Sequence, residues 1–314
     1  MTARGRSRHV LVVDPLHEEA IAELRRSFEV RSVIRPPEAH LRSLLRDADV
    51  LVMRSGIKLI ADHFAVAERL RIVARAGVGV DNIDLAAARR AGVRVFNVPD
   101  ASADSVAEFA FGLILTVARR ISLADRQVRD HQWNKAELAG TELRGKTLAV
   151  IGLGRIGSRV ARLGRGFGMD IVAVVPDPDG ATRDGVKVAT LPTALARADV
   201  VILAVPLTEQ TRRLITRDEL ALMKDSAYLV NVSRAEVVDE DDLYEALCTG
   251  RLAGAAVDVL AKERQATRLG ELPNVVLTPH IGAMTDDAQR RIGRAVVESI
   301  RTLLAGGSVT GLLC

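Results

Sequence analysis

A glycine pattern set between two apolar runs constrains the fold of this chain most. Gly152, Gly154 and Gly157 form a Gly-x-Gly-x-x-Gly pattern directly after the apolar run 147–151, and a helical pattern leads from it to a second apolar run, 171–175. Such glycines let the backbone turn tightly and approach a pyrophosphate, which the N-terminus of the following helix attracts. Glycines also permit ordinary turns, but the strand before and the helix after favour a dinucleotide site.

The end of the second apolar run departs from the usual dinucleotide pattern. An acidic residue is expected there, about 20 positions after the glycines, to bind the ribose hydroxyls of the adenosine. Val175 and Pro176 stand in that place, and Asp177 follows. Asp177 either reaches the ribose by a different route or is a solvated turn residue, and the sequence leaves both open. We expect NAD as the cofactor with NADP tolerated, because the discriminating carboxylate is absent and no cation replaces it.

Short β-branched runs alternate with helical patterns along the whole chain. This alternation predicts parallel sheets covered on both faces, and hence an α/β protein. The length of 314 residues suits two domains. In segments 47–52 and 197–202, Ala-Asp directly precedes an expected strand, and this internal similarity fits two doubly wound domains. The expected strands are 10–13, 50–53, 71–74, 93–96, 147–151, 171–175, 200–204, 228–231, 255–257 and 275–277, and the expected helices include 16–28, 102–119, 155–167, 239–249 and 286–304.

Composition excludes several classes of protein. The net charge is only +4, aromatic residues make up 3%, and the basic residues occur as short pairs, which argues against a nucleic-acid partner. No apolar run is long enough to span a bilayer, and the basic N-terminus leads into only a short strand, so we expect no membrane partner and no signal peptide. Cys248 and Cys314 form neither a disulfide framework nor a metal pattern, which predicts reduced thiols in a cytoplasmic protein without a metal.

Three polar residues follow apolar strands. Arg234 comes after the run 228–233, Glu263 lies in the loop beyond 255–259, and His280 follows 275–279. Taken singly, each has an ordinary interpretation as a solvated charge or a turn residue. Because ligands of open α/β sheets bind outside the carboxyl ends of the strands, the three together offer a cation, a carboxylate and an imidazole at one rim of a cofactor sheet.

Longer stretches resemble the D-isomer-specific 2-hydroxyacid dehydrogenase family, and among its members the phosphoglycerate dehydrogenases most. They cover most of the chain in the order that the family has. The stretches are ARAGVGVDNID (74–84), NVPDASADSVAEFAFGLIL (97–115), GTELRGKTLAVIGLGRIG (140–157), FGM (167–169), PLTEQT (206–211), NVSRAEVVDEDDL (231–243), GAAVDV (254–259) and NVVLTPHIGAMTDDAQ (274–289).

The resemblance implies two doubly wound parallel-sheet domains, a Rossmann nucleotide-binding domain inserted in a flavodoxin-like substrate domain. The substrate domain would comprise residues 1–98 and 285–314, and the NAD(P)-binding domain residues 99–284. Family members are typically homodimers through the nucleotide-binding domain, by the segment that matches 102–143. Because the helix 286–304 is the last one expected, we expect no appended regulatory domain.

The resemblance also implies the residues of the site. Arg234 would bind the substrate carboxylate and 2-keto oxygen, His280 would exchange a proton with the substrate, and Glu263 would fix the tautomer of His280. The residues implied to bind the cofactor are Gly152, Gly154, Arg155, Ile156, Gly157, Val175, Pro176, Asp177, Pro206, Thr211, Val232, Ser233, Asp258, His280 and Gly282. Those implied to bind the substrate are Arg54, Ser55, Gly56, Val78, Gly79, Arg234 and His280.

The implied function is an oxidoreductase that transfers a hydride between a nicotinamide cofactor and a D-2-hydroxy acid or 2-keto acid, of the phosphoglycerate, glycerate/hydroxypyruvate or glyoxylate type. The chain departs from the family pattern in Ala235 for a glycine, Arg264 for a proline, Ser102 for an asparagine and Ala204 for a histidine. Segment 133–137 is also less basic than in members that take phosphoglycerate. We therefore expect small unphosphorylated 2-keto acids to compete with phosphohydroxypyruvate.

Two other functions fit parts of the sequence. The same fold serves an NAD(H)-sensing corepressor that binds peptides, and retention of Arg234, Glu263 and His280 does not exclude this function. The other function is that of a methyltransferase with a glycine-rich loop. The full glycine pattern and the position of His280 argue against it.

Overall fold

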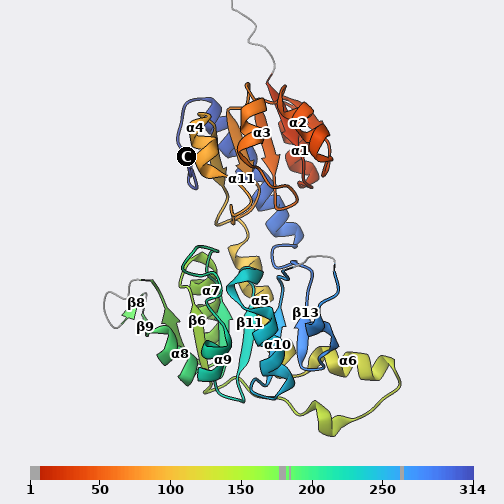
Figure 1. The fold of residues 1–314 in the computed structure, drawn as a ribbon, viewed down its shortest axis with the longest axis vertical. Helices are drawn as coiled ribbons and strands as arrows, with labels where there is room; N and C mark the ends of the chain where they lie inside the picture. Colours follow the sequence, from red (N-terminus) through yellow and green to blue (C-terminus); the bar gives the residue numbers. More distant parts are fainter. Residues whose placement is uncertain (1–7, 177–181, 184, 262–264) are drawn as a thin grey trace, which may run out of the picture. The chain divides into compact units, whose positions relative to one another are not determined.

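The computed structural model describes residues 8–176, 182–183, 185–261 and 265–314. The chain divides into two compact units, which we call unit 1 (Met1–Ser102 and Met284–Cys314) and unit 2 (Ala103–Ala283). Figure 1 shows both, with the C-terminal helix packed among the N-terminal elements of unit 1. In the described part of the chain, no helix is both long and apolar enough to cross a membrane.

Unit 1 is a parallel five-stranded sheet with helices on both faces. Its strand order, β2-β1-β3-β4-β5, is the flavodoxin-like order. One face is covered by α2, α3 and α4, and the other by α1 and α11, where Gly293 of α11 lies against Ala20 of α1. The strands are β1 His9–Val12, β2 Glu29–Ser32, β3 Val50–Met53, β4 Ile72–Arg75 and β5 Arg94–Asn97, and the helices are α1 Glu18–Arg25, α2 Glu38–Leu45, α3 Ala61–Val66, α4 Leu85–Arg90 and α11 Asp286–Leu304.

Unit 2 contains an eight-stranded sheet in the order β13-β12-β11-β10-β6-β7-β9-β8. Its strands run parallel except for the β8–β9 hairpin at the edge. Helices α5 and α7 cover one face, and α8, α9 and α10 cover the other. The strands are β6 Thr147–Ile151, β7 Asp170–Val174, β8 Thr182–Arg183, β9 Val186–Val188, β10 Val200–Leu203, β11 Tyr228–Asn231, β12 Gly254–Val257 and β13 Val275–Leu277. The helices are α5 Ala103–Ala118, α6 Ile121–Arg129, α7 Arg155–Gly166, α8 Leu191–Arg197, α9 Arg217–Leu222 and α10 Glu240–Cys248, with 3-10 turns η1 Lys135–Leu138, η2 Ala235–Val237 and η3 Arg268–Glu271.

The central strands explain why the apolar pattern predicted the sheets. In β10, Val201 and Leu203 pack against one layer of helices, whereas Val200 and Ile202 pack against the other. Side chains of a strand alternate between faces, so a strand buried on both faces must be apolar at every position. The prediction of two doubly wound parallel sheets is confirmed, and so is each expected strand to within one residue at either end.

Strands β2, β8 and β9 were not predicted. In β2, the residues Glu29–Ser32 are mostly exposed at the edge of the sheet, so the sequence there is polar. Strands β8 and β9 have two and three residues, too few to show a period. Their pairing is thus set by neighbouring strands rather than by their own sequence.

The Ala-Asp pairs at 48–49 and 198–199 have the same structural role in the two units. Asp49 accepts the N–H of His9 at 2.8 Å and pairs with Arg69 at 3.0 Å. Asp199 accepts the N–H of Thr147 at 2.8 Å and pairs with Lys224 at 2.9 Å. In both units, therefore, a half-buried aspartate ties the start of the first strand of the sheet to the strand beside it.

Candidate active site

The loops that hold the predicted residues of unit 2 leave the same edge of its sheet. Strands β13, β12, β11, β10, β6 and β7 are parallel neighbours in that order, so their carboxyl ends are aligned. His280, Asp258, Arg234, the 206–211 loop, the glycine loop and Val175 follow these strands in turn. From β6 the successive strands are added first on one side (β7) and then on the other (β10), so the strand order reverses between β6 and β10. Such a switch point forms the crevice where α/β proteins bind ligands.

The three glycines of the loop after β6 have three different surroundings. Gly152 has a φ of +96°, a conformation that favours glycine. A Cβ on Gly157 would lie 1.9 Å from the carbonyl oxygen of Gly152, so only glycine lets α7 approach the strand this closely. A Cβ on Gly154, the residue that precedes α7, would meet no atom within 4 Å. The loop is therefore tight on its inner side and open in front of the helix N-terminus, as a bound pyrophosphate requires.

The chain after β7, the loop after β10 and the first turn of α7 lie beside the glycine loop at this edge of the sheet. Val175 is 9% exposed and Pro176 is exposed at the end of β7, while Asp177 lies outside the described residues. Thr211 closes the loop after β10, because its hydroxyl donates to the carbonyl of Pro206 at 2.6 Å and accepts the N–H of Thr208 at 2.8 Å. Arg155 is exposed and Ile156 half-buried in the first turn of α7.

Arg234 lies in extended backbone at the exit of β11, one residue before η2. Asn231, 2% exposed, shapes this exit: its side-chain oxygen accepts the N–H and the hydroxyl of Ser233 at 3.0 and 2.8 Å, and its amide donates to the carbonyl of Arg234 at 2.9 Å. The guanidinium of Arg234 donates to the carbonyl of Ser233 at 2.7 Å, and Val232 is half-buried. Sequence reasoning missed Asn231, whose only signal was a polar residue in an apolar strand.

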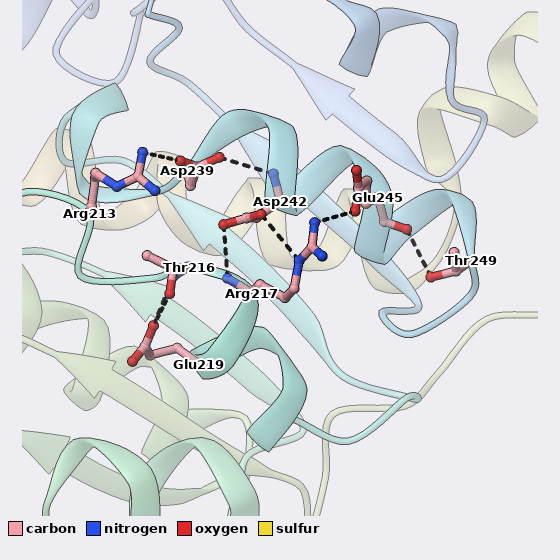
Figure 2. Close-up of polar contacts among 8 residues, drawn as sticks. All are labelled: Arg213, Thr216, Arg217, Glu219, Asp239, Asp242, Glu245 and Thr249. Atoms are coloured by element: carbon pink, nitrogen blue, oxygen red, sulfur yellow. Dashed lines mark hydrogen bonds and ion pairs between the residues drawn. The ribbon is translucent and has the colours of Figure 1, made fainter.

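An ion-pair network holds the chain that follows Arg234 (Figure 2). Asp239 accepts the N–H of Asp242 in the first turn of α10 and pairs with Arg213. Arg217, in the first turn of α9, pairs with Asp242 and Glu245 of α10. Between these helices, the carbonyls of residues 236 and 237 accept backbone N–H groups of residues 213 and 215. The segment 236–239, which follows Arg234, is thus bound to residues 213–215 just before α9, and α9 is bound to α10.

His280 has a φ of +57°, an uncommon conformation for a residue other than glycine. Its N–H donates to the backbone carbonyl of Asp258 at 2.8 Å. The Asp258 carboxylate, 2% exposed, accepts the hydroxyl of Thr278 and the N–H groups of Ile281 and Gly282 at 2.7 to 3.0 Å. Asp258 therefore holds the loop on both sides of His280, whose side chain is exposed. Glu263, the expected partner of His280, lies outside the described residues.

In unit 1, Asp14 organises the loop after β3. Asp14 is 2% exposed and accepts the N–H of Arg54 at 2.6 Å and of Gly56 at 3.3 Å. Burial lowers the pKa of the Arg54 guanidinium below its ordinary value, and the Asp14 carboxylate opposes that shift. Arg54 remains charged and donates to Gln289 of α11 at 3.1 Å, while Ser55 and Gly56 are exposed. Sequence reasoning missed Asp14.

Val78 and Gly79 lie in the loop after β4, at the same edge of the unit 1 sheet as the 54–56 loop. The side-chain amide of Asn82 joins the two loops, because it donates to the carbonyl of Arg54 at 2.8 Å and to that of Ile57 at 2.6 Å. Unit 1 thus brings together its predicted substrate residues. Over the described residues, no group of histidine, cysteine and acidic side chains could hold a metal ion.

Comparison with known proteins agrees with this geometry. The sequence profile of the D-isomer specific 2-hydroxyacid dehydrogenase NAD binding domain matches residues 111–282. The D-3-phosphoglycerate dehydrogenase of Methanocaldococcus jannaschii is 44% identical over 95% of this chain, which spans only 57% of that relative's length. The hydroxypyruvate reductase of Thermotoga maritima is 43% identical over 93% of this chain and 96% of its own length.

Solved structures share this fold. An NADPH-dependent glyoxylate/hydroxypyruvate reductase from Sinorhizobium meliloti, in complex with NADP and malonate, has a TM-score of 0.89 at 29% identity, over 98% of this chain and 97% of its own. A D-lactate dehydrogenase from Aquifex aeolicus, complexed with NAD and lactic acid, has a TM-score of 0.84 at 29% identity, over 95% and 96%. From the profile match and the identity to full-length relatives, we conclude that the chain belongs to the D-isomer specific 2-hydroxyacid dehydrogenase family.

Proposed function

We propose that this protein is an NAD(P)-dependent D-2-hydroxyacid dehydrogenase that interconverts small 2-hydroxy acids and 2-keto acids. The observation that supports this most is the alignment of the glycine loop, Arg234, Asp258 and His280 at one edge of the unit 2 sheet. In this proposal, residues 99–284 form the NAD(P)-binding domain, and residues 1–98 with 285–314 form the substrate domain.

The residues of unit 2 suit hydride-transfer chemistry. When bound, the nicotinamide accepts a hydride from the 2-hydroxy acid or gives one to the 2-keto acid. Arg234 binds the carboxylate and the 2-keto oxygen through its forked donors. His280 donates a proton to that oxygen during reduction and accepts it during oxidation. Glu263 is assigned to orient His280 on the resemblance alone.

The glycine loop, Val175 to Asp177, the 206–211 loop and residues 232–233 would hold the cofactor. The open space in front of α7 fits its pyrophosphate. NAD is the proposed cofactor with NADP tolerated, because apolar Val175 neither accepts the ribose hydroxyls nor repels a 2′-phosphate.

Unphosphorylated acids are the proposed substrates. A bound phosphate requires well-placed cations, and segment 133–137 has only Lys135. The test is steady-state turnover of glyoxylate, hydroxypyruvate and 3-phosphohydroxypyruvate with NADH and with NADPH. Turnover of an unphosphorylated acid at an efficiency equal to or above that of the phosphorylated one is expected. NADH binding without turnover of any acid would contradict the proposed dehydrogenase activity and favour a nucleotide-sensing binding protein.

We also propose a homodimer through unit 2. Ile121 and Val128 of α6 are 51% and 49% exposed, and Trp133 after it is 70% exposed. Residues seven apart share one face of a helix, so Ile121 and Val128 form an apolar surface that a second copy would bury. Sedimentation analysis should find a dimer, and Ile121→Glu with Val128→Glu should give a folded monomer. A cytoplasmic location is proposed from the free thiols of Cys248 and Cys314.

A further inference from the structure

In the loop after β4, two successive backbone carbonyls accept hydrogen bonds from residues at the end of β5. The carbonyl of Gly77 accepts the backbone N–H of Val98 at 3.0 Å. The carbonyl of Val78 accepts the side-chain amide of Asn97 at 2.6 Å. Asn97 is the last residue of β5 and only 9% exposed, and its own N–H donates to the carbonyl of Gly311 at 3.0 Å. The donors to the loop therefore come from the last residue of β5 and the residue after it, at a strand end that is itself held in place.

These bonds determine where two N–H groups of the loop point. The peptide bonds of this segment are trans. In a trans peptide unit, the C=O of one residue and the N–H of the next point in opposite directions. The Val98 N–H, by holding the Gly77 carbonyl, turns the N–H of Val78 outward. In the same way, Asn97, by holding the Val78 carbonyl, turns the N–H of Gly79 outward.

Both outward N–H groups are available to an anion. Across the described residues, neither the N–H of Val78 nor that of Gly79 has an acceptor, and Val78 is 37% exposed. Successive N–H groups that point the same way form a concave site for an anionic oxygen. The N–H of Val78 is oriented by a backbone donor, which only a proline substitution would remove, and the N–H of Gly79 by a replaceable side chain.

We propose that Asn97 is a positioning residue for the substrate carboxylate, acting through the N–H of Gly79. The proposal rests on the proposed function, because it assigns the loop of Val78 and Gly79 to that carboxylate. Asn97 does not contact the substrate in this scheme. It fixes the peptide plane whose N–H does.

The test is the kinetics of Asn97→Ala and Asn97→Asp with glyoxylate. Alanine removes the donor, whereas aspartate keeps the shape but places a carboxylate oxygen against the Val78 carbonyl. Because hydrogen bonds to charged groups are worth about 1.5–3 kcal/mol, we expect the KM for glyoxylate to rise roughly 10- to 100-fold, more in Asn97→Asp. The kcat should change far less, and the Kd of NADH should not change.

The matched control is Asn274→Ala in unit 2, which removes a side-chain amide that donates to the carbonyl of Ala253 at 3.4 Å. Its KM should equal that of the wild type. A purely structural role of Asn97 would lower the melting temperature and kcat together without a selective rise in KM. An unchanged KM in both Asn97 variants, with normal wild-type turnover, would overturn the positioning role and leave the proposed function intact.

An NMR titration tests the positioning role of Asn97 independently of the proposed dehydrogenase function. Oxalate, a dicarboxylate analogue of 2-keto acids, is titrated into ¹⁵N-labelled full-length protein while the amide signals are followed. We expect the Val78 and Gly79 signals of the wild type to shift on binding, and the Gly79 shift to be lost selectively in Asn97→Asp. If the wild type reduces no 2-keto acid, the proposed function fails, and this titration decides the role of Asn97 alone. Equal shifts in both proteins, or no shift in the wild type, would reject it.

Discussion

Asp258 holds His280 from two sides: its backbone carbonyl accepts the N–H of His280 at 2.8 Å, and its carboxylate accepts the N–H of Gly282 at 3.0 Å. The φ of His280, +57°, is a conformation that costs roughly 1–3 kcal/mol for a residue other than glycine. The hydrogen bonds to Asp258 offset that cost. The imidazole proposed to exchange the substrate proton is therefore presented by a loop whose shape depends on a buried carboxylate.

Replacing Asp258 should destabilise unit 2. Asp258→Ala leaves the buried N–H of Gly282, the half-buried N–H of Ile281 and the Thr278 hydroxyl without their acceptor, at about 1–3 kcal/mol each, so we expect a loss of about 3 kcal/mol or more in the free energy of unfolding. Asp258→Asn should lose less, because one oxygen remains. Thr278→Val, the control, removes one donor and leaves the backbone bonds, at about 1 kcal/mol. Urea titration measures all three, and equal stabilities of Asp258→Ala and Thr278→Val would refute the anchoring role.

Replacing His280 by alanine should nearly abolish turnover. General acid–base catalysis contributes about 10²- to 10⁴-fold, so kcat should fall within that range while NADH binding stays close to that of the wild type. His131→Ala is a matched control, because His131 is also exposed in unit 2 and also has a positive φ, +58°. Retention of most of the turnover in His280→Ala would show that another group exchanges the proton.

Val175→Asp should sharpen the preference for NAD. The new carboxylate would accept the ribose hydroxyls and repel a 2′-phosphate. A charged hydrogen bond is worth about 1.5–3 kcal/mol, so the NAD/NADP ratio of kcat/KM should rise roughly 10- to 100-fold. Val175→Asn introduces a side chain of the same shape as aspartate but without the charge, and it should change the NAD/NADP ratio of kcat/KM much less. A ratio that stays unchanged in Val175→Asp would mean that position 175 does not face the ribose.

Asp199 should stabilise unit 2 in a pH-dependent way. Burial raises its pKa, but the N–H of Thr147 and the ammonium of Lys224 lower it by more, so the pKa lies below its ordinary value of 3.8. The folded state then binds fewer protons than the unfolded state. The stabilisation is therefore complete above the ordinary pKa and is lost as the pH falls below it, through the folded pKa.

Asp199→Asn should accordingly be less stable than the wild type by about 1 kcal/mol or more at neutral pH. The difference should persist down to roughly pH 5 and shrink on further acidification. Asp170→Asn, which removes a carboxylate at an exposed position at the start of β7, is the control and should leave the stability at neutral pH nearly unchanged. Urea unfolding at a series of pH values measures this, and a difference that grows on acidification would contradict the sign.

Much of the fold followed from local chemistry. Strands such as β10 and β11 are buried on both faces, so their apolar sequences predict them without knowledge of their neighbours. The glycine loop is also local, because Gly152 needs its positive φ and Gly157 contacts a carbonyl only five residues earlier. Edge strand β2 could not be predicted in this way, since exposure leaves its sequence polar.

The sequence by itself determined the buried strands, the long helices, the glycine loop and, with the resemblance, the set of candidate residues. Only the tertiary structure showed how Asp14, Asn97 and Asp258 hold the loops of the candidate site. The donors or acceptors that they engage lie 19 to 42 residues away in the chain. A hydrogen bond forms only between groups about 3 Å apart, and nothing in the local sequence of either partner specifies that separation. It is set by the order and register of the parallel strands.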